Sequence, residues 1–329
     1  MKGLLSHISY WMFAVVSLLL VACEPATIDN EPQTTTQTPI TFGNTTNRAN
    51  TSYVDIPDNQ VNATLWGYKQ SEWVFGEDDN LGVDARIESD GNGVTSLTPE
   101  GDSKLWNPGN YYFVSTWPNV SGSTVSLSGE VHIPNYNLSE QNNLSEQTAD
   151  GWTDLRLATV TANGSEYIAN TNSIELNYKR LLTKIVFKGK SSSNVPAKLN
   201  RLSVTIPSTA SYSATDVFAN EPNGSWEVEN LTCILTYNNS GTGWKLSNSG
   251  TIVTEVYVFP QKEDTSIPVI INILSAGIDL DRNGSISNKW QAGKQYTYTF
   301  TIDEAGGIFF DEPTITPWGE ASAGPTIVF

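Results

Sequence analysis

Few residues of this sequence have side chains that could do covalent chemistry, and one of them stands in a motif that predicts lipidation. Cys23 ends the sequence Leu20-Val21-Ala22-Cys23, which follows an apolar run that begins at Tyr10. The run is too short to span a membrane comfortably but suits a secretory signal. Because small residues before a cysteine are typical of a bacterial lipobox, we expect residues 1–22 to be a lipoprotein signal peptide and Cys23 to be diacylated. An ordinary signal peptide or a short membrane anchor with a chance cysteine is the alternative.

Other reactive side chains are too scarce to build an enzyme. After signal removal, His132 is the only histidine, and it alternates with Val131 and Ile133 as in a strand. A site with more than one imidazole cannot be assembled, and a Ser-His-Asp triad would have to be built on this residue. Cys233 has no partner once Cys23 is lipidated, so we expect a small buried hydrophobe and no disulfide scaffold. The sequence therefore predicts no enzyme and no cofactor.

A short acidic stretch imitates a calcium loop. Asp279, Asp281 and Asn283 fall at alternate positions before Gly284, as the oxygen ligands of an EF-hand do, but Trp290 stands where the bidentate glutamate should be. The flanking residues have the pattern of strands. We therefore expect an Asn283-Gly284 hairpin turn and no metal site, while weak cation binding at Asp279 to Asn283 stays open.

Composition limits the class of protein further. The 329-residue chain has a formal charge of −17, and removal of residues 1–22, whose only charged side chain is Lys2, leaves −18. Such a surface repels phosphates, so we expect no nucleic-acid partner. Charged residues are only 16% of the chain while Thr, Ser, Asn and Gly are abundant, which is typical of a secreted all-β protein with many turns.

The elements that would position these residues are nearly all strands. Between Lys289 and Trp318, Tyr296, Tyr298, Phe300 and Ile302 alternate strictly with threonines, which is the pattern of a half-buried antiparallel strand. Turn dipeptides such as Asn163-Gly164 and Asn223-Gly224 separate the expected strands. Helix is predicted only around Ser139 to Thr148 and Asp154 to Thr159. The other expected strands are 63–68, 111–116, 124–133, 173–177, 182–188, 199–206, 231–237, 252–259 and 269–274.

Several of these segments resemble the fimbrillin family of type V pilus subunits. The resemblance rests on the signature Trp290-x-Ala-Gly-Lys-x-Tyr-x-Tyr-x-x-x-Ile302 and on the Ile315-x-x-Trp318 end. Four further segments also resemble the family: Trp106 to Phe113, Asp154 to Ala158, Ile174 to Phe187 and Val256 to Gln261. It implies two transthyretin-like antiparallel β-sandwich domains in tandem, over residues 53–172 and 173–329. Residues 23–52, rich in Thr, Gln, Asn and Pro, would form a tether with a removable N-terminal strand at Ile40 to Phe42.

The resemblance also implies how such a protein works. An Arg-specific protease would cut between Arg48 and Ala49, which lie in a polar segment suited to cleavage, although a solvated linker arginine is the alternative. The C-terminal strand of a neighbouring subunit would then fill the groove left by the lost strand. The candidate donor strand is Thr314 to Phe329. The side chains that would anchor it in the groove are Ile315, Trp318, Ile327 and Phe329.

The expected product is a fimbria that supports adhesion. Head-to-tail contacts of this kind do not close, so they generate filaments. The expected partners are other fimbrial subunits, the lipid anchor of the precursor, the protease, and a host protein or glycan at the outer membrane. An anchor or tip subunit, or a monomeric glycan-binding lipoprotein, is the alternative.

Overall fold

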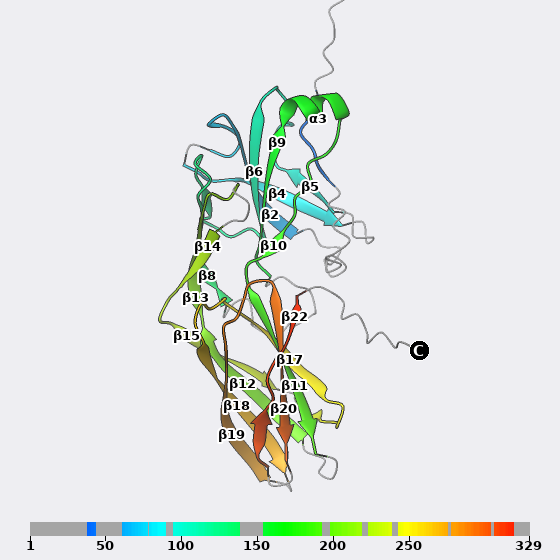
Figure 1. The fold of residues 1–329 in the computed structure, drawn as a ribbon, viewed down its shortest axis with the longest axis vertical. Helices are drawn as coiled ribbons and strands as arrows, with labels where there is room; N and C mark the ends of the chain where they lie inside the picture. Colours follow the sequence, from blue (N-terminus) through cyan, green and yellow to red (C-terminus); the bar gives the residue numbers. More distant parts are fainter. Residues whose placement is uncertain are drawn as a thin grey trace, which may run out of the picture. The chain divides into compact units, whose positions relative to one another are not determined.

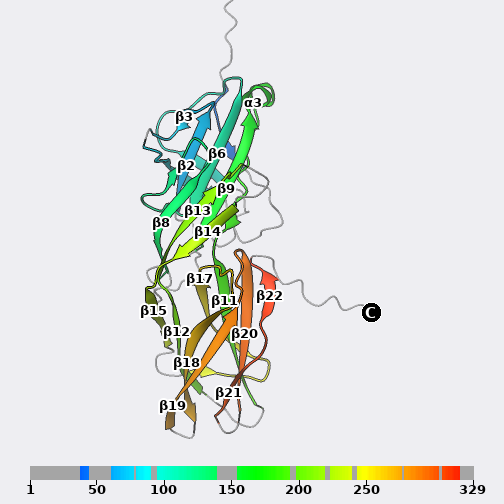
Figure 2. The same cartoon turned by 60° about the vertical axis from the view of Figure 1, so that its left-hand side comes forward.

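A computed structural model describes the following residues of the chain: 38–43, 61–77, 79–89, 95–138, 154–192, 198–218, 223–238, 243–275, 278–303 and 306–318. The chain from Thr38 onward forms one compact unit. It is an all-β sandwich protein built from four sheets, with the short helix α3 (Gly164–Asn170) beside them (Figures 1 and 2). Among these residues no helix has the length and apolar character needed to cross a bilayer.

The largest sheet, here the β2 sheet, carries the N-terminal strand at one edge. Its order is β1-β5-β4-β2-β6-β9-β10, with β3 also paired to β2. The strands are β1 (Phe42–Gly43), β2 (Val61–Lys69), β3 (Glu72–Phe75), β4 (Val83–Ser89), β5 (Thr95–Pro99), β6 (Asn110–Trp117), β9 (Arg156–Asn163) and β10 (Lys179–Arg180).

A smaller sheet, the β8 sheet, joins strands that lie far apart in the sequence. Its order is β14-β13-β8-β7, formed by β7 (Thr124–Val125), β8 (Val131–Asn137), β13 (Thr209–Thr215) and β14 (Asn223–Val228). Trp66 and Val114 of the β2 sheet share a buried cluster with Val131 and Ile133 of β8. The β8 sheet therefore packs against one face of the β2 sheet.

The other two sheets form a sandwich with a common core (Figure 2). The β20 sheet has the order β17-β11-β20-β21 with β22 also on β20, and the β12 sheet has the order β15-β12-β18-β19 with β16 also on β12. Their strands are β11 (Thr183–Ser191), β17 (Thr251–Val258), β20 (Lys294–Ile302), β21 (Ile308–Phe310) and β22 (Thr314–Pro317), then β12 (Lys198–Pro207), β15 (Thr232–Asn238), β16 (Trp244–Lys245), β18 (Thr265–Ser275) and β19 (Ile278–Asn288).

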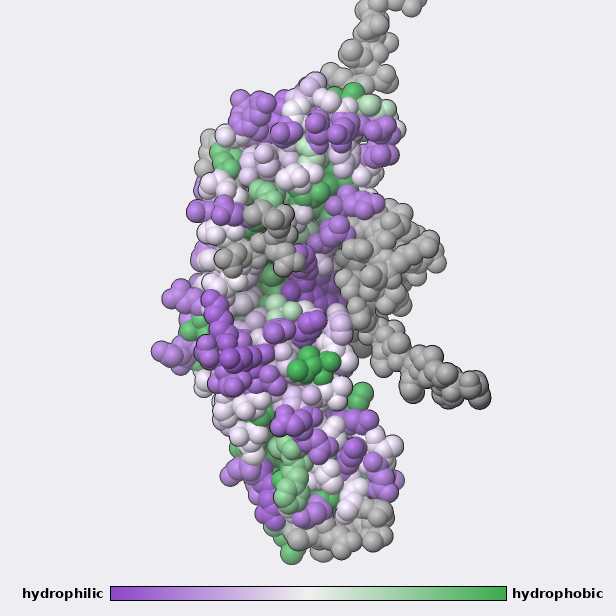
Figure 3. Space-filling model, in the orientation of Figure 1, coloured by the Kyte–Doolittle hydropathy of each residue, from purple (hydrophilic) through white to green (hydrophobic). Residues whose placement is uncertain are grey.

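The predicted alternation of β20 is confirmed. Tyr296, Tyr298, Phe300 and Ile302 are buried, while the threonines between them are half-buried. The same period of two places Leu202, Val204 and Ile206 of β12 in the core. On the face shown in Figure 3, hydrophobic side chains lie in separate patches among hydrophilic ones.

Several local predictions are wrong. Asp154 to Thr159 is not helical but leads into β9, and Ser173 to Asn177 contains only an isolated bridge at Ile174. The segment 124–133 is split into β7 and β8 by a turn. Asn163-Gly164 is not a turn between two strands, because β9 ends there and the Asn163 side chain caps α3 by accepting a hydrogen bond from the Ser165 amide. The predicted helix at Ser139 to Thr148 lies outside the described residues.

Two further Asn-Gly pairs lie inside strands. Asn223-Gly224 pairs with Thr215 and Ala214 in β13, and Asn283-Gly284 pairs with Ile270 and Val269 in β18. Neither glycine has the positive φ that a two-residue hairpin turn of this kind requires. The hairpin predicted at Asn283-Gly284 is therefore wrong, since β19 runs straight through it.

The domain boundary predicted near Asn172 stays a prediction. The β8 sheet contains strands from both sides of that residue, and so does the β2 sheet through β10. The two parts of the chain therefore share sheets as well as a buried cluster.

We predict that Gly224→Ala destabilises the protein by about 1–3 kcal/mol, because a Cβ there would collide with the ring and Oη atom of Tyr212, a side chain that is only 5% exposed. The free energy of unfolding in denaturant measures the loss. Ser225→Ala, an exposed change in the same strand, serves as the control and should alter stability by about 0.5 kcal/mol or less. Equal stability of the two variants would contradict the packing of Tyr212 over Gly224.

Candidate functional site

The N-terminal segment Thr38 to Gly43 lies as an inserted strand with alternating burial. Ile40 and Phe42 are 6% and 5% exposed, while Pro39 and Thr41 between and beside them are exposed. This is the pattern of a strand that buries one face. The segment predicted to be removable is therefore seated in an apolar groove through two side chains.

The backbone of this segment is hydrogen-bonded to neighbours on both sides. On one side the Ile40 amide donates to the Lys104 carbonyl at 2.8 Å, and Phe42 pairs with Leu97 of β5. On the other side the Ile174 amide donates to the Thr41 carbonyl at 2.8 Å, and the Gly43 amide donates to the Ile174 carbonyl at 3.2 Å. Loss of the segment would leave both lips of the groove with unpaired backbone groups.

Aromatic rings from separate segments of the chain form the floor of the groove. The Phe42 ring meets Phe75 and Phe113 edge to face, with ring centroids 5.7 and 5.3 Å apart. Trp106 lies 6.1 Å from Phe113 and stacks on Tyr167 of α3 at 4.6 Å. Burial, followed by the nearby Glu175 and Glu166 carboxylates, raises the pKa of Tyr167. The groove therefore offers pockets for an aliphatic and an aromatic side chain spaced two residues apart.

The predicted donor region begins with a strand that is paired within its own sheet. In β22, Ile315 lies opposite Tyr296 of β20, and the Ile315 side chain is 52% exposed at the sheet edge. Trp318, at the end of β22, is only 8% exposed, and its amide donates to the Gly293 carbonyl at 2.9 Å. Ile315 and Trp318 thus belong together in the β20 sheet.

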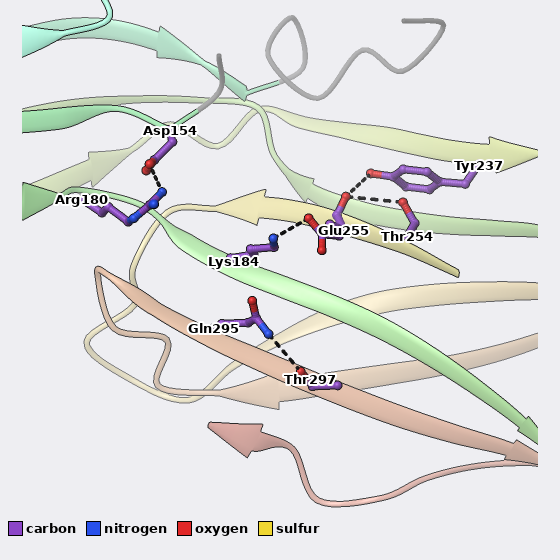
Figure 4. Close-up of polar contacts among 8 residues, drawn as sticks. All are labelled: Asp154, Arg180, Lys184, Tyr237, Thr254, Glu255, Gln295 and Thr297. Atoms are coloured by element: carbon purple, nitrogen blue, oxygen red, sulfur yellow. Dashed lines mark hydrogen bonds and ion pairs between the residues drawn. The ribbon is translucent and has the colours of Figure 1, made fainter. Parts of the chain in front are cut away.

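A buried ion cluster lies beside Trp318 and contacts its ring through Arg180. The Arg180 Cζ atom lies 4.2 Å from the centre of the Trp318 ring, and that ring stacks on Tyr257 at 5.2 Å. Arg180 in turn forms an ion pair with Asp154, whose side chain is 1% exposed (Figure 4). Asp154 also accepts a hydrogen bond from Arg156 Nε at 2.6 Å.

The cluster has a clear electrostatic origin. Arg180 of β10 and Arg156 of β9 lie directly opposite each other across the strands, so two like charges face one another. The Asp154 carboxylate between them provides the opposite charge that such burial requires. This site was not predicted from the sequence, although the charged Asp154-x-Arg156 beside the apolar Leu155 and Leu157 was a signal of it.

The remaining candidate residues have structural partners. His132 is exposed, and its Nδ1 atom lies 3.0 Å from the Ser213 Oγ atom. Cys233 is half-buried against the core, and burial raises the pKa of its thiol, which keeps it protonated and weakly reactive. No group of three or more His, Cys, Asp or Glu side chains gathers in the part of the chain that the structure describes.

The residues of the imitated calcium loop also have other partners. On the straight strand β19, Asp281 accepts hydrogen bonds from Asn272 at 2.8 Å and from Arg201 at 2.9 Å, while Asp279 accepts one from Asn200 at 2.9 Å. The Asn272 hydrogen bond and the Arg201 guanidinium lower the pKa of Asp281. Asp281 thus binds side chains of both β12 and β18, and Asp279 binds one of β12.

Five of the predicted site residues cannot be placed. Cys23, Arg48, Ala49, Ile327 and Phe329 lie outside the described residues. The structure therefore places the N-terminal strand and its groove, together with the beginning of the donor region. The lipidation site, the cleavage site and the end of the donor strand therefore remain predictions.

A sequence model of the fimbrillin-like family matches residues 76–318, which is most of the chain. The chain belongs to the fimbrillin-like family. This membership supports a role as a fimbrial subunit or an adhesin at the cell surface. No curated protein is a significant match to the sequence.

Solved structures show the same fimbrillin-like fold in other proteins. A fimbrial protein from Bacteroides vulgatus has a TM-score of 0.54 at 13% identity, over 84% of this chain and 99% of that one. A proposed cell adhesion protein from Bacteroides uniformis has a TM-score of 0.53 at 13% identity, over 87% of this chain and 99% of that one. At these identities the likeness concerns the fold alone.

We predict that Asp154→Asn lowers the free energy of unfolding by about 3–5 kcal/mol, because it removes a buried carboxylate that binds two buried guanidinium groups. Denaturant titration measures the change. Asp281→Asn, which removes an exposed carboxylate that also binds an arginine, is the matched control and should have little effect. Similar small losses for both variants would contradict a structural role of the buried cluster.

Proposed function

We propose that this protein is a subunit of a cell-surface fimbria that polymerises by exchange of strands. The observation that carries the proposal is the way in which Thr38 to Gly43 is packed and hydrogen-bonded. This short segment fills an aromatic groove and is hydrogen-bonded on both sides, yet it stands at the N-terminal end of the fold. A strand held in this way can be replaced by another strand with the same pattern.

Proteolysis at Arg48 would free this strand. The cut would break the covalent link between the segment at Thr38 to Gly43 and β2, which begins at Val61. Before the cut, the strand is held at high effective concentration because it is part of the same chain. After the cut it can dissociate, and a strand of a neighbouring subunit can compete for the groove.

The C-terminal end of the chain has the pattern that the groove requires. Ile327-Val328-Phe329 repeats the order of Ile40-Thr41-Phe42, with an aliphatic residue, a residue on the opposite face, and a phenylalanine. In an extended strand Ile327 and Phe329 would therefore occupy the pockets of Ile40 and Phe42. Their backbone amides and carbonyls would hydrogen-bond to the same lips of the groove. Because donor and acceptor lie on different parts of the chain, such contacts continue into a filament.

Export and anchoring complete the proposal. The lipidated Cys23 would hold the precursor at the outer membrane until the cut at Arg48 separates the tether from the folded part. The partners would be other fimbrial subunits and the Arg-specific protease. A host protein or glycan would be the target of adhesion.

The first test concerns the cut. We predict that Arg48→Ala leaves the precursor uncleaved at this site and abolishes the ladder of oligomers that unheated samples from the cell surface should show in a detergent gel. Mass spectrometry of the N-terminus should find Ala49 first in the natural protein. Arg86→Ala, in the body of β4, is the control and should leave both results unchanged. A ladder that persists in uncleaved Arg48→Ala protein would overturn protease-triggered exchange, whereas a monomer with an acylated Cys23 would favour an anchor subunit.

The second test concerns the donor. We predict that Phe329→Ala weakens the association of subunits by about 100-fold or more, because loss of a buried phenylalanine costs about 3–5 kcal/mol. Val328→Ala, on the opposite face of the same strand, is the matched control and should retain most of the association. The concentration dependence of the oligomer ladder measures both. Equal loss in the two variants would count against insertion of alternate side chains into the groove.

A further inference from the structure

We infer that β22 and Trp318 stay with their own subunit during exchange, so that the donated segment begins at Gly319. Asp154, Arg180 and Trp318 then form an anchor for the root of this tail. The inference rests on the proposed strand exchange and narrows the donor, which the sequence alone extends back to Thr314. It assigns to the buried ion cluster a positioning role in assembly.

The pairing of β22 is the first reason. Thr314 to Pro317 lies antiparallel to β20, with Ile315 opposite Tyr296 and Thr316 opposite Gln295. The inner strand β20 is bordered on its other side by β11. Removal of β22 would therefore leave unpaired backbone groups along half of the β20 edge, next to the buried side chain of Tyr296.

The fixation of Trp318 is the second reason. Its indole ring is held between the Arg180 guanidinium and the Tyr257 ring, and its amide donates to the Gly293 carbonyl. A cation over a tryptophan face contributes most where water is excluded, as it is for a ring that is 8% exposed. To donate Trp318, the subunit would have to give up all three contacts.

The ion cluster makes this loss more costly. The Arg180 guanidinium is held by Asp154, which also binds Arg156, so its position is set by β9 as well as by β10. Removal of Trp318 would take away the apolar cover of a buried cation that cannot move away from its carboxylate. The cluster therefore connects the end of β22 to the last strands of the β2 sheet.

A fixed root limits how far the tail can reach. Gly319 to Phe329 has 11 residues, which span at most about 40 Å when fully extended. Pro325 lacks an amide proton, so regular pairing in the groove is expected to begin after it. The residues from Gly319 to Gly324 would then connect one subunit to the next. The groove of the neighbouring subunit must lie within this reach of Trp318.

A reversible cross-link tests whether β22 moves. Gln295→Cys and Thr316→Cys place two cysteines at directly opposed positions of β20 and β22, where the Cα atoms are close enough for a disulfide. Cys23→Ser and Cys233→Ser remove the other thiols. The full chain is oxidised or kept reduced, cut after Arg48 with an arginine-specific protease, and followed by the oligomer ladder in unheated gels.

We expect the oxidised and reduced forms to polymerise at rates within about twofold of each other, because only the tail after Trp318 is donated. A ladder in the reduced form but not in the oxidised form would overturn the inference while leaving strand exchange intact. No ladder in either form, nor in the unsubstituted chain, would overturn strand exchange and the inference with it. A second disulfide at Thr205→Cys and Ile234→Cys, between β12 and β15, controls for oxidation itself.

A rescue experiment separates positioning from stability. Trp318→Ala should loosen the root of the tail and slow polymerisation, and Arg180→Gln should do the same with Trp318 intact. Trp318→Ala is then combined with Gln295→Cys and Thr316→Cys. In this variant, oxidation would fix β22 again at Thr316, three residues before the tail begins. Restored polymerisation in the oxidised form is the expected result. Failure of the cross-link to restore it, in a variant that remains folded by hydrogen exchange, would contradict the positioning role.

Discussion

The structure depends on one constraint, which is that backbone amides and carbonyls in an apolar groove must be hydrogen-bonded. The groove between Lys104 and Ile174 meets this constraint only when a strand lies in it, because its lips point toward one another and its floor is aromatic. An empty groove would expose these rings together with unpaired polar groups. The N-terminal strand is therefore part of the fold and, in the proposed assembly, also the part that is exchanged.

The ion cluster at Asp154 shows the same constraint for charged groups, which must also be paired when they are buried. Two arginines that face each other across paired strands share a buried carboxylate, which offsets the cost of burying two like charges. Tryptophan rings then cover the guanidinium planes, since Arg156 lies over Trp117 at 4.3 Å and Arg180 lies over Trp318 at 4.2 Å. Such an arrangement is rigid, because each member is placed by at least two others. This rigidity suits a fixed starting point for the segment that we propose is donated.

Local patterns in the sequence predicted the strands better than the connections between them. Period-two alternation in β20 follows directly from burial of one face, so the strand could be predicted from its own residues. Asn223-Gly224 and Asn283-Gly284 could not be interpreted correctly in this way, because their pairing with β13 and β18 overrides the local preference for a turn. The groove was also hidden, since Phe75, Trp106 and Phe113 come from separate segments. The strand at Ile40 to Phe42 was located through the family resemblance.

The shared β8 sheet has a consequence for how the chain acquires its structure. β8 pairs with β13, and Ser213 lies opposite His132 about eighty residues later in the sequence. The first half of the chain supplies only β7 and β8 of this sheet, so the sheet that packs on Trp66 is incomplete until β13 and β14 have been added. Folding of such non-local pairings is slow, and a chain that emerges from its N-terminus stays incompletely folded during this interval. In the proposed export of the precursor, this delay would keep the chain unfolded for longer, since the shared sheet is complete only when both halves are present.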